Sequence, residues 1–219
     1  MSKQNAAQYI RDNIQLIKDK NFKEFYHKLE YADFVSDVSE ILLGSGVNPL
    51  LYLEEVPKKF LCNSKIDSIT IPNNIKTIGD KSFNSCHKLT SVTIPDSVTF
   101  IDVGAFGRCS RLETVSIGEG LKRIDRGAFV QCDSIEYVNL PDSLTIIEPM
   151  AFMLCISLKE VSLPKGILLT NDGAFCECDI DKVEYRGTVE DWHNVTVGKG
   201  VFGGNKVKVI TCLDGEVKL

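Results

Sequence analysis

Apolar positions recur every 23 residues through the middle of the chain. The repeating units follow the pattern LxxVxIPxxVxxIxxxAFxxCxx, and they begin at Ile66, Leu89, Leu112, Ile135 and Leu158. A phenylalanine and a cysteine keep one place each in all five units, as Phe83, Phe106, Phe129, Phe152 and Phe175 and as Cys86, Cys109, Cys132, Cys155 and Cys178. Because two residue types share one period, the pattern predicts a repeat protein in which equivalent side chains stack.

Each unit opens with the alternation of apolar and polar residues that is typical of a short strand. In the second unit this stretch is Val92-Thr93-Ile94, and Pro95 follows it directly. Proline has no N–H to donate, so it ends the strand at a fixed point. The same place is held in other units by Pro72, Pro141 and Pro164, and in the third unit by Gly118. The roughly fifteen residues left in each unit are too few for a long helix, which predicts a solenoid with one strand per coil.

The unit IPxxVxxIgxxAFxxC resembles the BspA-type leucine-rich repeats, closely over residues 66–179 and more loosely over 56–219. The resemblance implies an α/β repeat solenoid of leucine-rich-repeat coils, with a parallel sheet on its concave side and a role in protein recognition. Many bacterial members are exported surface proteins or adhesins. The first twenty residues here lack an apolar export signal, so the chain resembles the small intracellular or phage-encoded members.

Both ends of a solenoid need caps, because an end coil exposes an apolar face. We expect a helical N-terminal cap domain over residues 1–55 and a solenoid over 56–219, with repeats at 66–179 and an irregular C-terminal cap at 180–219. The helical signals are the shared face of Ile10, Ile14 and Ile17, the capping box of Asn21 and Glu24, and the apolar side formed by Phe34, Val38, Ile41 and Leu42. Phe60 lies one period before Phe83 and indicates a degenerate first coil. At the other end, Thr188 is expected to cap a short helix that buries Trp192, and 207–213 to form a closing strand.

Composition excludes several classes of function. The chain has 25 basic and 30 acidic side chains, a net charge of -5 and a pI near 5.3, so we expect no nucleic-acid partner. No apolar run approaches the ~18 residues that cross a bilayer, so we expect no membrane contact and a cytoplasmic location. Hydrophobic residues make up 43% of the chain, which is enough to build a core.

Eight cysteines suggest disulfides or a metal, but five of them occupy equivalent places in the repeat. Stacked coils hold such side chains ~4.8 Å apart, farther than a disulfide requires, so we interpret them as buried groups that donate to turn carbonyls. Cys176 and Cys178 form the single close pair, with no histidine or second pair nearby to complete a zinc site. The glycine cluster of Gly198, Gly200, Gly203 and Gly204 lacks the lysine and the strand-to-helix context of a phosphate loop. We therefore expect no catalytic residue, metal or cofactor.

Two surfaces are candidates for binding a partner. On the concave sheet, recognition chemistry is confined to later units, where we select Tyr137, Asn139 and Glu160. On the return side, the unit from Ile135 places apolar residues where other units are mainly polar or glycine, namely Ile146, Met150, Met153, Leu154 and Ile156. At the place of Ile146, Phe100 and Leu169 are also apolar. Exposed apolar patches usually mark contacts, although the C-terminal segment could instead fold over this one.

The function that follows is a non-enzymatic interaction module with a rigid surface for a protein partner. One concrete version is a phage protein that binds and blocks a host enzyme or defence protein. The alternatives are a homo-oligomeric structural component joined through the apolar patch, or a cysteine-based metal protein or hydrolase.

Overall fold

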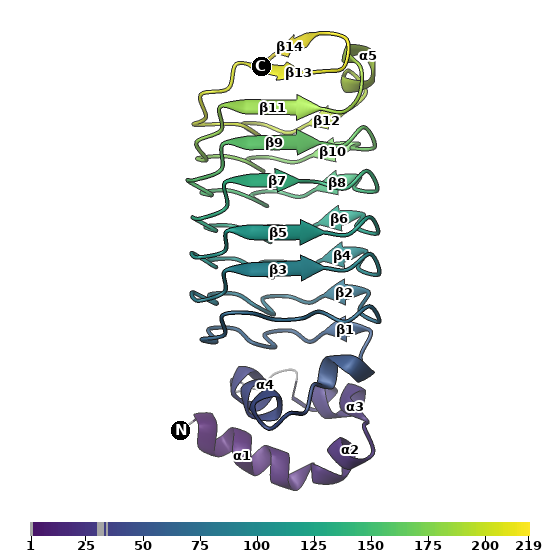
Figure 1. The fold of residues 1–219 in the computed structure, drawn as a ribbon, viewed down its shortest axis with the longest axis vertical. Coiled ribbons are helices and arrows are strands. Elements are labelled where there is room, and N and C mark those ends of the chain that lie inside the picture. Colours follow the sequence, from purple (N-terminus) through teal and green to yellow (C-terminus); the bar gives the residue numbers. More distant parts are fainter. Residues whose placement is uncertain (1, 30–32, 34) are drawn as a thin grey trace.

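The computed structural model describes residues 2–29, 33 and 35–219. The chain forms a parallel-strand solenoid of about seven turns, with coils stacked along one axis and a group of helices at the N-terminal end (Figure 1). Within the described residues, no helix is long and apolar enough to cross a membrane.

The N-terminal helices pack together beneath the first coil (Figure 1). They are α1 (Ser2–Asp12), α2 (Ile14–Lys18), α3 (Phe22–His27), α4 (Val35–Gly44) and the 3-10 helix η1 (Pro49–Tyr52). The Asn21 side chain caps α3 by accepting from the Glu24 N–H, as predicted. The reciprocal bond of a capping box is not made, because the Glu24 carboxylate accepts from the Asn21 side chain and the Asn21 N–H donates to the Leu16 carbonyl. The prediction that Ile10, Ile14 and Ile17 share one helical face is wrong, because the helix breaks at Asn13 and Ile14 is exposed. Phe34 lies outside the described residues.

Each coil contributes a short strand to a seven-stranded parallel sheet. The short strands, in sheet order, are β1 (Glu55–Val56), β2 (Thr77–Ile78), β4 (Phe100–Ile101), β6 (Arg123–Ile124), β8 (Ile146–Ile147), β10 (Leu169–Thr170) and β12 (Thr196–Val197). In the successive steps from β2 to β10, each residue pairs with the residue 23 positions later, so the sequence period sets the register of this sheet.

A second set of longer strands lies on another side of the solenoid and is divided into two sheets. The prediction of one strand per coil is therefore wrong, because most coils contain a long and a short strand. The first sheet pairs β3 (Ser91–Ile94) with β5 (Thr114–Ile117). The second contains β7 (Tyr137–Asn139), β9 (Glu160–Leu163), β11 (Lys182–Tyr185), β13 (Val209–Thr211) and β14 (Glu216–Lys218). The strands that follow one another are parallel except for β13 and β14, which form the closing antiparallel pair.

The phenylalanines form the predicted stack through the core. Rings from Phe83 to Phe175 are buried and stack with centroids 5.1–5.3 Å apart and interplanar angles of at most 12°. Phe60 meets Phe83 edge-on at 6.3 Å, and Phe202 extends the stack above Phe175 at 5.6 Å. Each buried ring contributes roughly 1.5–3 kcal/mol from apolar burial, so the stack is a main source of stability.

The five repeat cysteines make the predicted hydrogen bonds. Each Sγ donates to a backbone carbonyl of the preceding coil at 3.1–3.2 Å, for example Cys132 to Phe106 and Cys155 to Phe129. Burial raises the pKa of Cys132 to about 12. This thiol therefore remains protonated at neutral pH, as a donor to a carbonyl must be.

The C-terminal cap has the predicted elements. Thr188 caps the short helix α5 (Val189–Trp192) in a reciprocal capping box with Asp191. Trp192 is buried and meets Tyr185 edge-on at 5.1 Å. Gly200 and Gly204 adopt φ values of 57° and 80° in the last turn of the solenoid, which gives the glycine cluster a structural explanation.

Candidate functional site

The structure distributes the predicted binding residues over three sides of neighbouring coils. Tyr137 and Asn139 lie on β7, and Glu160 lies opposite Tyr137 on β9. Ile146 lies on β8 in the short-strand sheet, whereas Met150, Met153 and Leu154 lie in the turn segment that follows. The eight predicted residues therefore do not form one surface, and each side has to be considered separately.

The apolar residues after β8 form a surface that we call the turn-side patch, consisting of Met150, Met153, Leu154 and Ile156. Met150 is 44% exposed and Ile156 is 57% exposed, whereas Met153 and Leu154 are half-buried. The C-terminal segment does not cover Met150 or Ile156, because it continues the stack of coils at the far end (Figure 1). The alternative of an internal cover is thus wrong for these two side chains.

Two residues of the turn-side patch have a left-handed backbone. Each turn contains two residues with positive φ. In neighbouring coils the first of these two residues is a glycine, as Gly104, Gly127 and Gly173. Met150 and Leu154 adopt φ values of 61° and 63°. Left-handed backbone costs a side-chain-bearing residue roughly 1–2 kcal/mol relative to glycine. The patch therefore keeps large apolar side chains at a cost in backbone energy.

On the long-strand side, two of the three predicted residues already have partners within the chain. The Lys182 ammonium lies 2.6 Å from the Glu160 carboxylate, and this contact raises the pKa of Lys182. Arg186 donates to the Asn139 side chain at 2.9 Å and to the Asp142 carboxylate at 2.7 Å. Tyr137 remains 49% exposed.

The sheet of longer strands is interrupted beside Tyr137, which the sequence interpretation missed. No strand pairing joins β5 to β7, and Figure 1 shows the wider step between them. A cleft of about 510 Å³ occupies this step, lined by Glu113, Val115, Ile117, Glu136, Tyr137 and Asn139. Gly118, which replaces the repeat proline directly after β5, is a departure from the repeat beside this step.

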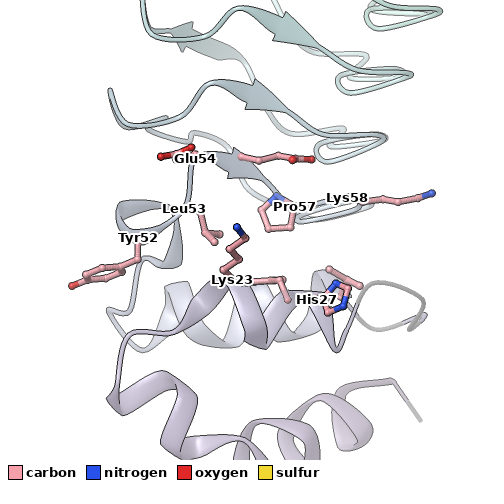
Figure 2. Close-up of a pocket in the computed structure, with 10 residues that line it drawn as sticks. Lys23, His27, Tyr52, Leu53, Glu54, Pro57 and Lys58 are labelled. Carbon is pink, nitrogen blue, oxygen red and sulfur yellow. The ribbon is translucent and has the colours of Figure 1, made fainter.

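A second hollow of about 570 Å³ separates the helical end from the first coil (Figure 2). Lys23 and His27 enter its lining from α3, and Glu54 and Lys58 come from the start of the solenoid. The Lys58 ammonium also lies 3.0 Å from the Asp80 carboxylate. This lining mixes both charges and does not select one sign of ligand.

Metal binding and histidine chemistry can both be examined over the part of the chain that the structure describes. No group of three or more histidine, cysteine, aspartate or glutamate side chains there is placed to hold a metal ion. His27, His87 and His193 are exposed on separate parts of the chain, as predicted.

Comparison with known proteins relates the repeats to one family. The model of the BspA type leucine rich repeat region matches residues 78–207 in six copies. A leucine-rich repeat protein from Eubacterium ventriosum is similar in structure, with a TM-score of 0.64 and 23% identity over 71% of this chain and 41% of its own. A leucine rich cell surface protein from Faecalibacterium prausnitzii gives a TM-score of 0.54 and 25% identity over 61% of this chain and 35% of its own.

A Treponema pallidum leucine rich repeat protein gives a TM-score of 0.50 and 24% identity over 64% of this chain and 76% of its own. The chain spans less than half the length of the Eubacterium ventriosum and Faecalibacterium prausnitzii proteins. No curated protein matches it.

Proposed function

This chain belongs to the BspA-type leucine-rich repeat family, and from that premise we propose that it is a non-enzymatic module that binds a protein partner through the turn-side patch. Leucine-rich repeat proteins generally bind proteins, using surfaces that extend over several coils. The proposal selects one surface of this chain for that role.

The carrying observation is the exposure of Met150 and Ile156 beside Met153 and Leu154. At the places of Met150 and Ile156, the first repeat has Lys81 and His87, both of which are exposed polar residues. Methionine side chains adapt to irregular apolar surfaces and are common where proteins dock. The patch thus has the composition of a contact surface, on a side where the two neighbouring coils have glycine or polar residues at three of its four places.

The repeat framework supports binding by holding the patch in place before contact. Backbone hydrogen bonds tie the patch to both neighbouring coils, from the Gln131 N–H to the Met153 carbonyl at 2.9 Å and from the Leu154 N–H to the Cys176 carbonyl at 2.9 Å. A preorganised surface loses little conformational entropy on association, so more of the contact free energy is available for affinity.

The test compares two double variants at equivalent places in different coils. Met150→Gly with Ile156→Ser removes the apolar groups, whereas Lys81→Gly with His87→Ser makes matched changes in the first repeat. We expect affinity capture from cells of the source organism to retain a protein on wild type and on the control, and to lose it on the patch variant. Identical captured proteins on all three would refute the patch.

Sedimentation of the same three proteins tests the homo-oligomeric alternative. A wild-type oligomer that becomes a monomer only in the Met150→Gly, Ile156→Ser variant would identify the patch as a self-association surface. A wild-type monomer would exclude that role and leave the heterologous partner.

A further inference from the structure

The cleft between β5 and β7 lies where the backbone pairing of the long strands is interrupted. The Gly118 N–H donates to the Ile94 carbonyl at 2.8 Å and holds the end of β5 against β3. The residue one period later is Pro141, which has no N–H to offer the Ile117 carbonyl. Pro164 likewise has no N–H one period further on, and β7 and β9 pair there, so Pro141 alone does not account for the step. What the structure shows is that β5 pairs with β3 on one side and with no strand on the side of β7.

The separation uncovers side chains whose counterparts in the two neighbouring coils are buried. Val92 and Ile94 on β3 are 3% and 1% exposed, and Val138 on β7 is 1% exposed. Their counterparts Val115 and Ile117 on β5 are both half-buried. The floor of the cleft is therefore apolar and accessible at the place where a neighbouring strand normally covers it.

Two carboxylates stand at the end of the cleft where the strands begin. Glu113 and Glu136 are exposed, occupy equivalent places in successive coils and both line the cleft. Neither side chain has a hydrogen bond or ion pair in the part of the chain that the structure describes. Like charges one coil apart repel each other, so a cation between them would be favoured.

The remaining rim restricts what can enter. The exposed Tyr137 ring lies beside the carboxylates and offers a face for a cationic group. At the other end, Asn139 is held by Arg186, whose charge is in turn met by Asp142. The groups of the cleft that have no partner within the described part of the chain are thus the apolar floor and the two carboxylates at one end.

We propose that this cleft binds a segment of a partner protein that carries a lysine or arginine beside an apolar side chain. The apolar side chain packs on Val115 and Ile117, and the cationic group lies between Glu113 and Glu136 against Tyr137. Charge complementarity selects this occupant, because an acidic segment would meet two unpaired carboxylates. The cleft lies on the long-strand side and does not include the turn-side patch, so the two sites are independent.

The probe is a yeast-displayed library of random 12-residue peptides, selected on the immobilised full chain at low ionic strength. We expect enrichment of peptides with lysine or arginine within two positions of leucine, isoleucine, methionine or phenylalanine. Enrichment of acidic peptides, or of no class above an unselected library, would overturn the proposal.

A synthetic peptide from the enriched class is then titrated by fluorescence anisotropy. Glu113→Gln with Glu136→Gln is expected to weaken binding at least tenfold, and Tyr137→Ser severalfold. The control, Glu190→Gln with Glu216→Gln, makes the same change in net charge at exposed places in the C-terminal cap and is expected to leave affinity within twofold. Equal loss in both double variants would show general attraction to an acidic protein and overturn the site.

Two further measurements separate this proposal from the others. Met150→Gly with Ile156→Ser should leave the affinity of the cleft for the peptide unchanged. The peptide titration therefore tests the cleft alone, and the capture experiment tests the turn-side patch alone. A wild-type dimer that the Glu113→Gln, Glu136→Gln variant dissociates would assign the cleft to a second copy of the chain and overturn the peptide proposal.

Discussion

The short-strand sheet and the long-strand side of the same coils differ in continuity. Seven short strands pair without interruption from β1 to β12, whereas the long strands divide between β5 and β7. The turns beside the short strands carry a regular ladder of hydrogen bonds, such as the Phe106 N–H to the Ala128 carbonyl at 2.7 Å and the Phe129 N–H to the Ala151 carbonyl at 2.8 Å. The turn ladder and the ring stack therefore keep the coils in step, and the long-strand side is free to vary.

The largest loss of stability is expected from a break in the phenylalanine stack, which supports both sides of the coils. Phe129 is fully buried and stacks on Phe106 at 5.3 Å and on Phe152 at 5.1 Å. Phe129→Ala should lower the free energy of unfolding by about 3–5 kcal/mol, through lost burial and the cavity left behind. Urea denaturation measures this loss. Tyr137→Ala is the exposed control, and it should change the free energy of unfolding by no more than about 0.5 kcal/mol. Equal losses in the two variants would contradict the ring stack as the common support.

The next effect is confined to the long-strand side. A Cβ added at Gly118 would lie 2.4 Å from the Asp96 nitrogen and 2.6 Å from the Pro95 carbonyl carbon, so the backbone must move. Gly118→Ala should therefore destabilise the chain by about 1–3 kcal/mol, as overpacking does. Gly44→Ala is the control, since its Cβ would meet no atom within 4 Å. Amide hydrogen exchange should rise along β3 and β5 and stay unchanged in the short strands; a uniform rise would contradict the independence of the two sides.

The buried thiols predict a dependence of stability on alkaline pH. Burial raises the pKa of Cys132 from 9.0 to about 12, so its contribution is complete below pH 9 and is lost as pH rises toward 12. The unfolded chain releases this proton first, which lowers the free energy of unfolding by roughly 1.4 kcal/mol per pH unit for this thiol. Denaturation of wild type and Cys132→Ala between pH 8 and 11 measures the difference. Parallel pH profiles would show that Cys132 does not contribute.

The smallest effect tests the backbone cost of the turn-side patch. Met150→Gly relieves a left-handed residue, and we expect it to raise the free energy of unfolding by about 0.5 kcal/mol after the entropy cost of glycine. Lys81→Gly changes the equivalent place, where φ is 53°, and should have a similar effect. Thermal denaturation compares the two. A clear loss of stability in Met150→Gly alone would mean that Met150 supports the fold rather than a contact.

Much of the core was predictable because it depends on the period alone. Phe83 and Cys86 recur with identical spacing, and stacking identical coils places each ring on the next. The extension of the stack to Phe202 was missed, since an insertion of four residues separates it from the 23-residue rule. The turn-side patch was predictable as an exception to the repeat, and its exposure at Met150 and Ile156 came from the structure.

The polar surface depended on contacts that no local pattern contains. Asn139 and Glu160 have the chemistry of recognition residues, yet Arg186 holds the first from 47 residues away and Lys182 holds the second from 22 residues away. Glu113 and Glu136 have ordinary surface chemistry, and only the separation of β5 from β7 makes them the rim of a cleft.

The amino-acid sequence by itself determined the family, the coil length, the buried ladder and the chemistry of the caps, because each follows from local spacing and from equivalent side chains meeting at every turn. The tertiary structure decided which polar groups stay unpaired and where the sheet opens. Those outcomes depend on contacts between coils that are distant in the sequence, such as the bond from Arg186 to Asn139 and the absence of pairing between β5 and β7.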